Sequence, residues 1–242
     1  MKHITSLIVG IAVVVFALLI GNAYRYKFKQ TERIAVTGAA ETNFTADLIV
    51  WSATYSRNSS ILQDAFNELK ADEQKVRAYL SQQGLSDTEI VYSSVNIEKL
   101  YNSSYDENGR ITGTVFAGYR LSQTVKVESK HINKVDKISR EITGLIQQGI
   151  ELTSSTPNYF YTKLGDLKID LLAKASADGQ KRAETIAKNA GQTLGGLKKA
   201  SMGVFQIIGQ NEDESYAYGG AFNNTRLKKS ASITVKMEFD VK

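Results

Sequence analysis

The stretch that most constrains the fold is a long amphipathic segment from Asp166 to Gly195. Its apolar and small residues recur at intervals of three, four and seven, the period of one face of an α-helix. They are Ile169, Leu172, Ala173, Ser176, Ala183, Ile186, Ala187 and Ala190. We therefore predict one helix, which needs another surface to cover its apolar face. Because a glycine inside a helix costs roughly 1 kcal/mol relative to alanine, a kink or a break at Gly179 is the alternative.

Both ends of this helix carry recognisable signals. Asp166 can cap its start, and Gly191 stands where a left-handed residue commonly ends a helix. The charged residues fall mainly outside the apolar face and predict a solvent-facing surface rather than a binding site. They are Lys168, Lys174, Asp178, Lys181, Arg182, Glu184 and Lys188.

The remaining chain alternates between strand and helix patterns. Period-two alternation predicts strands at 33–41, 46–56, 89–100, 114–128, 150–162, 197–210 and 230–241, and helical spacing predicts helices at 61–83 and 131–148. From Ala46 the order is strand, helix, strand, strand, helix, strand, which is the split β-α-β pattern of ferredoxin-like sheets. We predict an α+β fold with an antiparallel or mixed sheet and three main helices packed on it, forming one domain from residue 32 to 242.

Several local features refine this prediction. Asn108-Gly109 is a turn signal inside a long hairpin loop at 102–113. Pro157, the only proline, places its segment at a sheet edge or a bulge. Trp51 is predicted to be a packing residue on a strand covered on both faces. The last strand, 230–241, alternates most regularly, so we expect it to pair inside the sheet, whereas 210–226 lacks any period and is predicted to be a loop.

Residues 1–31 form a separate N-terminal segment. Leu7–Ile20 is an uninterrupted apolar run, and extended to residues 4–24 it is about long enough to cross a ~30 Å hydrocarbon core. Aromatic and basic residues alternate just after it, which favours a retained transmembrane anchor. A cleaved signal peptide is the alternative, with Gly21 and Ala23 as small residues before a cut. The basic residues after the span favour a cytoplasmic body by the positive-inside rule.

The residue inventory excludes several kinds of chemistry. There is no cysteine, so thiolate catalysis is impossible, and His3 and His131 are the only histidines. The glycine-rich spots lack the context of a phosphate loop. Glu212, Asp213 and Glu214 lack the alternation of a calcium loop and are predicted to be solvated. A net charge of +5 without clustering does not indicate nucleic-acid binding. We assign no catalytic, cofactor-binding or metal residues and expect no cofactor and no enzymatic activity.

Residues 35–56, 118–129 and 177–195 resemble three segments of proteins of the SIMPL family. Residues 35–56, AVTGAAETNFTADLIVWSATYS, are similar to the family's opening strands, with Asp47 matching its Asp and Ala46 standing where Pro is usual. Residues 118–129, GYRLSQTVKVES, resemble its Gly-Tyr strand, and residues 177–195 its Ala-rich third helix, with Gly179 where Ala is common. The resemblance covers residues 34–241 and implies an exported envelope domain that forms closed oligomers. Some members are linked with oxidative-stress defence and some with surface antigens.

The resemblance and the residue patterns together give two functional hypotheses. The first is a membrane-anchored, non-enzymatic protein at the inner membrane, single-pass, with its body in the periplasm, that acts by homo-oligomeric assembly or by binding an envelope protein. Implied export outweighs the charge bias, because long domains cross largely regardless of flanking charge; a cleaved, soluble periplasmic form is the alternative. The second is a ligand-binding or signalling module that uses tyrosine-rich loops. Those tyrosines are Tyr101, Tyr105, Tyr159, Tyr161, Tyr216 and Tyr218.

Overall fold

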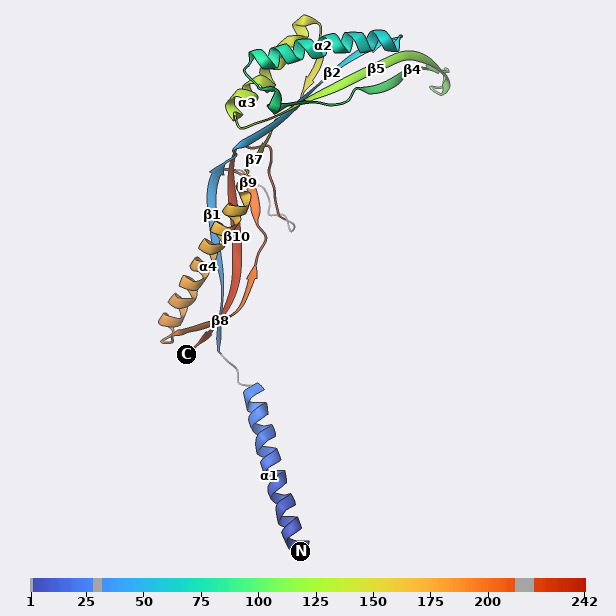
Figure 1. The fold of residues 1–242 in the computed structure, drawn as a ribbon. Coiled ribbons are helices and arrows are strands. Elements are labelled where there is room, and N and C mark those ends of the chain that lie inside the picture. Colours follow the sequence, from blue (N-terminus) through green and yellow to red (C-terminus); the bar gives the residue numbers. More distant parts are fainter. Residues whose placement is uncertain (1, 28–31, 212–219) are drawn as a thin grey trace. The chain divides into compact units, whose positions relative to one another are not determined.

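A computed structural model describes residues 2–27, 32–211 and 220–242, and these residues form an α+β fold (Figure 1). The elements are α1 (Lys2–Lys27), β1 (Arg33–Thr45), β2 (Leu48–Ser59), α2 (Leu62–Gln82), β3 (Ile90–Tyr92), β4 (Asn96–Tyr105), β5 (Ile111–Ser129), α3 (Ile132–Glu141), β6 (Glu151–Ser154), β7 (Asn158–Phe160), α4 (Leu164–Asn189), β8 (Leu194–Met202), β9 (Gln206–Gly209) and β10 (Lys228–Val241). Short 3₁₀ turns, Asp87–Glu89 and Ile142–Gln148, precede β3 and continue α3.

The described chain divides into two compact units. The first comprises residues up to Ala40 together with Leu172–Gly203 and Thr234–Lys242, and the second comprises Glu41–Leu171 and Val204–Ile233. The strands form two sheets, where we predicted one. One sheet has the order β1-β10-β8, with β9 also on β10, and the other has the order β3-β5-β2-β6, with β4 on β5 and β7 on β2.

The second sheet confirms the predicted split β-α-β arrangement. Its strands β2, β5, β3 and β6 pair antiparallel. Helix α2 connects β2 to β3, and helix α3 connects β5 to β6. The prediction that a third main helix packs on the same sheet is wrong. In the first unit α4 lies against β1 and β10 instead, as the approach of Gly38 to Gly179 and of Gly179 to Met237 shows.

The long helix is continuous through Gly179, so the predicted alternative of a break into two helices is wrong. The glycine has a packing reason: a Cβ built on Gly179 would lie 2.8 Å from the Met237 sulfur, and one built on Gly38 would lie 2.5 Å from the Gly179 nitrogen. Two glycines therefore let the helix and the strand approach closely.

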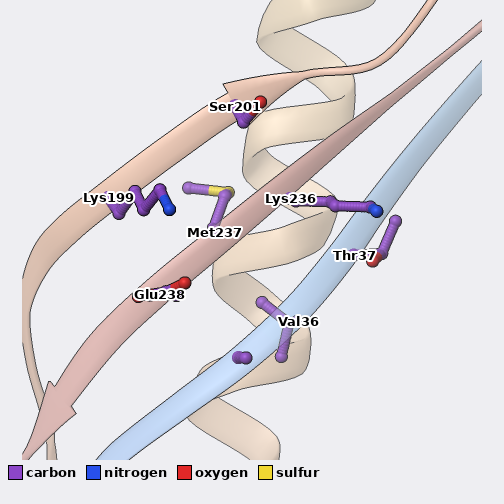
Figure 2. Close-up of a pocket in the computed structure, with 8 residues that line it drawn as sticks. Val36, Thr37, Lys199, Ser201, Lys236, Met237 and Glu238 are labelled. Atoms are coloured by element: carbon purple, nitrogen blue, oxygen red, sulfur yellow. The ribbon is translucent and has the colours of Figure 1, made fainter.

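Helix α4 begins at Leu164, so the prediction that Asp166 caps its start is wrong: Asp166 lies in the first turn. The helix ends at Asn189, before Gly191 in the left-handed conformation (φ 75°), as predicted, and Leu194 and Gly195 belong to β8 rather than to the helix. Figure 2 shows the three strands β1, β10 and β8 in front of this helix.

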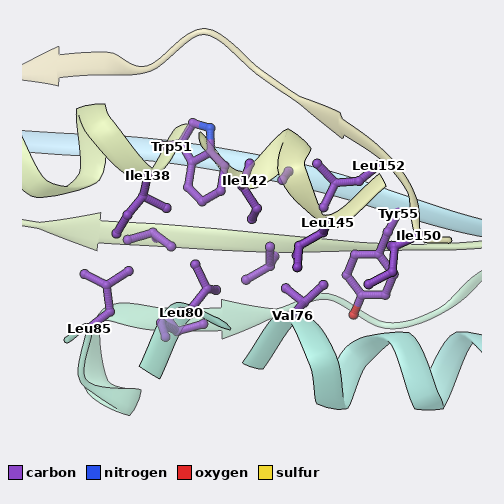
Figure 3. Packing of buried hydrophobic residues seen from close by; sticks show 14 of the residues in the cluster. Trp51, Tyr55, Val76, Leu80, Leu85, Ile138, Ile142, Leu145, Ile150 and Leu152 are labelled. Atoms are coloured by element: carbon purple, nitrogen blue, oxygen red, sulfur yellow. The ribbon is translucent and has the colours of Figure 1, made fainter. Parts of the chain in front are cut away.

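The second unit buries its main core between α2, α3 and one face of the β2–β5 pair (Figure 3). Trp51 and Tyr55 are fully buried at the centre, as the packing interpretation of Trp51 predicts. Trp51 donates its ring N–H to the Ser154 hydroxyl at 3.0 Å. The opposite face of β2 is not covered in the way we predicted, because it carries the partly exposed hydroxyls of Ser52 and Thr54, bonded to neighbouring strands.

The structure also tests the predictions for the hairpin, for Pro157 and for the last strand. The predicted hairpin loop at 102–113 is mostly strand. β4 extends to Tyr105 and β5 begins at Ile111, so the turn itself is short, and Gly109 lies in it with φ 74°. Pro157 lies between β6 and β7, where no ladder bond is needed. The closing strand β10 lies between β1 and β8, which confirms that it pairs inside a sheet.

The N-terminal segment is helical from Lys2 to Lys27. Apolar side chains from Val13 to Ile20 are exposed, among them Phe16 at 64% and Leu18 at 67%. Within the part of the chain that the structure describes, no helix has the length and mean hydropathy needed to cross a membrane.

Candidate functional site

The strand β1 leaves one edge without a strand partner. Within the described chain β1 pairs with β10, and its other edge faces α4. Ala39 donates its backbone N–H to the Asp178 carboxylate at 3.0 Å, so the backbone groups of Ala39 face away from β10. In an antiparallel strand this direction repeats every second residue, so Thr37 and Ala35 present their N–H and C=O groups to the same side.

An open groove of about 780 Å³ runs along this edge. Ala35 and Thr37 of β1 form one wall, and the other wall comes from α4, with Asp178, Arg182 and Ile186 among its residues. Ile186 is an apolar residue that is 48% exposed, although helical spacing predicts it on the covered face. The groove therefore combines unpaired backbone groups, an apolar contact and charge, which are the features that bind an extended peptide by strand addition.

The charges in the groove are fixed by two contacts of Asp178. Its carboxylate accepts the Ala39 N–H and also the Arg182 Nε–H, the latter at 2.7 Å. These two contacts, the backbone one first, hold the pKa of Asp178 below its usual range, so the carboxylate is charged at neutral pH. The predicted solvent-facing charges of α4 thus include one residue that ties the helix to the free edge of β1.

The opposite edge of the same sheet is also open. Within the described chain β8 pairs only with β10, and its residues from Gly196 to Met202 are exposed. Leu197 and Met202 are 49% and 62% exposed. A strand of this kind presents a row of unpaired N–H and C=O groups to any chain that reaches it. The first unit therefore has two edges, β1 and β8, that can each accept another strand.

The face of this sheet away from α4 is polar. A pocket of about 370 Å³ lies there between Ala35, Lys199, Ser201, Lys236 and Glu238 (Figure 2). The one acidic residue among these five, Glu238, forms an ion pair with Arg33 at 3.6 Å.

The residues singled out in the sequence do not form one site. His131 is exposed at the start of α3, where it lines a surface pocket with Lys130 and Lys134. The acidic cluster at 212–214 and the tyrosines Tyr216 and Tyr218 lie outside the described residues. Tyr101 and Tyr105 lie exposed on β4.

Tyr161, by contrast, belongs to a group of residues that the sequence analysis did not bring together. Phe44, Phe160, Tyr161, Phe222 and Lys229 line a pocket of about 310 Å³ in the second unit. Lys229 is buried, with 3% of its surface exposed, so it is not part of a surface basic patch. A signal for this existed: the buried parity of β10, continued backwards from Ile233, places Lys229 on the covered face.

The comparison with known proteins covers most of the chain. The family model for SIMPL, described as a protein of unknown function (DUF541), matches residues 34–239. The chain is also similar to the 26 kDa periplasmic immunogenic protein of Brucella melitensis biotype 1, with 25% identity over 175 residues, which covers 71% of this chain and 67% of that protein. The protein of the same name from Brucella abortus (strain S19) is 24% identical over 175 residues, with the same coverage. On this match, which spans both compact units, the chain belongs to the SIMPL family.

Proposed function

We propose that this protein is a non-enzymatic component of the bacterial envelope that acts by pairing strands with other chains. The free edge of β1, with its groove along α4, is the observation that carries the proposal. The occupant is a strand from a second copy of the chain or from an envelope partner. The exposed edge of β8 is the complementary surface that a second copy offers, because one copy can pair β8 against the β1 edge of the next.

The proposed location is the periplasmic side of the inner membrane. Residues 4–24 are the proposed anchor, since the apolar run Leu7–Ile20, extended to these bounds, is about as long as a hydrocarbon core is thick, although no described helix has the length and mean hydropathy of a membrane span. The relatives in Brucella are named as periplasmic proteins, which supports a periplasmic body. The basic residues after the span oppose this orientation, but long domains translocate largely regardless of flanking charge.

The assignment to binding rather than catalysis rests on the sequence. Without cysteine and with two histidines, one of them at residue 3, the chain offers few groups for nucleophilic or acid–base catalysis. The family resemblance adds oxidative-stress defence as the setting for this binding. A strain lacking the protein should therefore be more sensitive to hydrogen peroxide than its parent.

Replacement of Thr37 by proline tests the strand-pairing proposal. The variant Thr37→Pro removes one outward-facing N–H without removing a bond to β10, and proline is tolerated on edge strands. The matched control Thr37→Ala removes the side chain and keeps the N–H. The full chain in a mild detergent should sediment as an oligomer for the wild type and for Thr37→Ala, and as smaller species for Thr37→Pro. A monomeric wild type at high concentration would refute assembly.

A second measurement separates self-assembly from partner binding and tests the location. If the wild type is monomeric but a chemical cross-linker captures an envelope protein that Thr37→Pro fails to capture, the partner is a different protein. Protease added to intact spheroplasts should degrade the body of the chain. Full protection in spheroplasts, with degradation after lysis, would place the body in the cytoplasm and refute the proposed topology.

A further inference from the structure

The pocket of about 310 Å³ in the second unit is independent of the strand edges. Its walls come from β1, β7, the start of α4, β9, the segment after residue 220 and β10. The volume is at the small end of the range for ligand sites in proteins, which is roughly 300 to 1,000 Å³. It has room for a single substituted ring but not for a dinucleotide.

Aromatic rings form the walls. Phe44 and Tyr161 lie with ring centroids 4.9 Å apart and planes tilted by 55°. Phe160 and Phe222 complete the lining and remain 37% and 52% exposed, although both are large apolar side chains. Exposed aromatic rings that converge on one cavity favour a flat apolar ligand, because ring pairs gain beyond simple burial.

The polar group of the pocket is the ammonium of Lys229. It donates to the backbone carbonyl of Tyr159 at 2.7 Å and to that of Asn223. Both acceptors are neutral, and among the ion pairs formed by described residues none includes Lys229. A buried charge without a counter-ion is costly, and burial accordingly lowers the pKa of Lys229. An ammonium has three hydrogens, so one remains after these two bonds.

The segment that carries Tyr159, one of the two carbonyl acceptors of Lys229, is itself held in place. The Tyr159 hydroxyl donates to the Asp136 carboxylate at 2.8 Å, and the Tyr159 backbone N–H donates to Asn224 at 2.7 Å. Thr162 donates both its N–H and its hydroxyl to Asp47, each at 2.7 Å. The segment that carries Phe160 and Tyr161 is therefore fixed at both ends, and binding requires little ordering of the protein.

We propose that this pocket binds a small monocyclic aromatic carboxylate. The ring lies among Phe44, Tyr161 and Phe222, and the carboxylate accepts the remaining hydrogen of the Lys229 ammonium. The anion supplies the counter-charge that the buried ammonium lacks, and the ring covers aromatic surface that is otherwise exposed to water. This inference does not depend on the strand-pairing function, because none of these residues lies on the free part of the β1 edge.

A second cation nearby provides the control. The ammonium of Lys168 lies 5.2 Å from the Phe205 ring centroid and 5.6 Å from that of Phe222. Lys168 is exposed, so it could attract an anion without a pocket. The variants Lys229→Met and Lys168→Met therefore distinguish binding inside the pocket from attraction at the surface.

The experiment is calorimetric titration of the full chain in a mild detergent with sodium benzoate and with benzyl alcohol, its neutral analogue. We expect saturable binding of benzoate that Lys229→Met weakens at least tenfold and Lys168→Met changes less than threefold. Benzyl alcohol should bind the wild type more weakly than benzoate does. Absence of saturable benzoate binding, or equal weakening by the two methionine variants, would overturn the proposal.

A wall variant keeps the test decisive if Lys229→Met does not fold. Phe222 is half exposed, so Phe222→Ala should leave the melting temperature nearly unchanged while it weakens benzoate binding severalfold. Unchanged benzoate affinity in a folded Phe222→Ala protein would place the ligand elsewhere and refute the site.

Discussion

Replacement of Gly38 by alanine should loosen the contact between α4 and its sheet. The methyl group would lie 2.5 Å from the Gly179 nitrogen and 2.8 Å from the Gly179 Cα, both backbone atoms that cannot rotate away. The strand and the helix must therefore separate locally. Overpacking in a well-packed core typically costs 1 to 3 kcal/mol, and we expect about 3 kcal/mol here because backbone opposes backbone.

The matched variant Gly179→Ala places its methyl group at the same contact but against a different neighbour. Its closest atom is the Met237 sulfur at 2.8 Å, the flexible end of a side chain, and the next is the Gly38 nitrogen at 3.3 Å. Alanine also gains roughly 1 kcal/mol of helix propensity. The two effects oppose each other, so Gly179→Ala should stay within about 1 kcal/mol of the wild type.

Hydrogen exchange of the α4 amides measures this difference locally, which suits a chain of two compact units better than one global unfolding curve. A loss of about 3 kcal/mol corresponds to roughly 100-fold faster exchange in Gly38→Ala. Exchange in Gly179→Ala should change less than about tenfold. Equal acceleration in the two variants, or none in Gly38→Ala, would refute the assignment of this contact to the backbones.

Three further predictions concern the second unit. Asp72→Ala should cost about 1.5 to 3 kcal/mol, seen as a lower melting temperature, because Asp72 is 1% exposed and accepts a hydrogen bond from Arg57 (Nη2 at 2.9 Å), which would keep only its longer ion pair with Glu68 at 4.0 Å; an unchanged melting temperature would contradict this. Burial raises the pKa of Tyr159 to about 12. The neutral Tyr159 hydroxyl therefore stabilises the fold fully below the unfolded pKa near 10, and this stabilisation is lost between about pH 10 and 12. In Tyr159→Phe the melting temperature should depend less on pH in that window. The Ser129 hydroxyl lowers the pKa of Glu89, so the charged Glu89 carboxylate stabilises the fold above the unfolded pKa near 4.3, and this stabilisation is lost as the pH falls through the folded pKa. The melting temperature of Glu89→Gln should therefore fall less on acidification than that of the wild type. Identical profiles of melting temperature against pH for the two proteins would exclude the contact.

Local patterns predicted the elements well where one face of an element is buried. The alternation of β10 and the helical spacing of α2 each follow from a single covered face. The order of strands and helices from Ala46 was also enough to predict the split β-α-β sheet. By contrast, the number of sheets was predicted wrongly, because periodicity shows that a helix has an apolar face but not which sheet covers it.

The candidate sites were harder to predict, since each depends on long-range pairing. A strand at a sheet edge has the same alternation as one in the middle, so nothing in residues 33–45 distinguishes the free edge of β1. The contact between Gly38 and Gly179 likewise joins two positions that no local pattern connects. Lys229 is the exception, because continuing the parity of β10 backwards would have placed its charge on the buried face.

The position of β10 has a consequence for how the chain folds. This strand lies between β1 and β8, yet it begins at residue 228 while β1 ends at residue 45. The sheet of the first unit therefore cannot close until the last strand has been made, whereas the β3-β5-β2-β6 sheet needs only residues 48–154. Pairing across such a long separation is slow, because the loop entropy must be lost before the contacts form. During vectorial synthesis or export the β3-β5-β2-β6 sheet can form first, and β1 stays with both edges unpaired until β10 has been made.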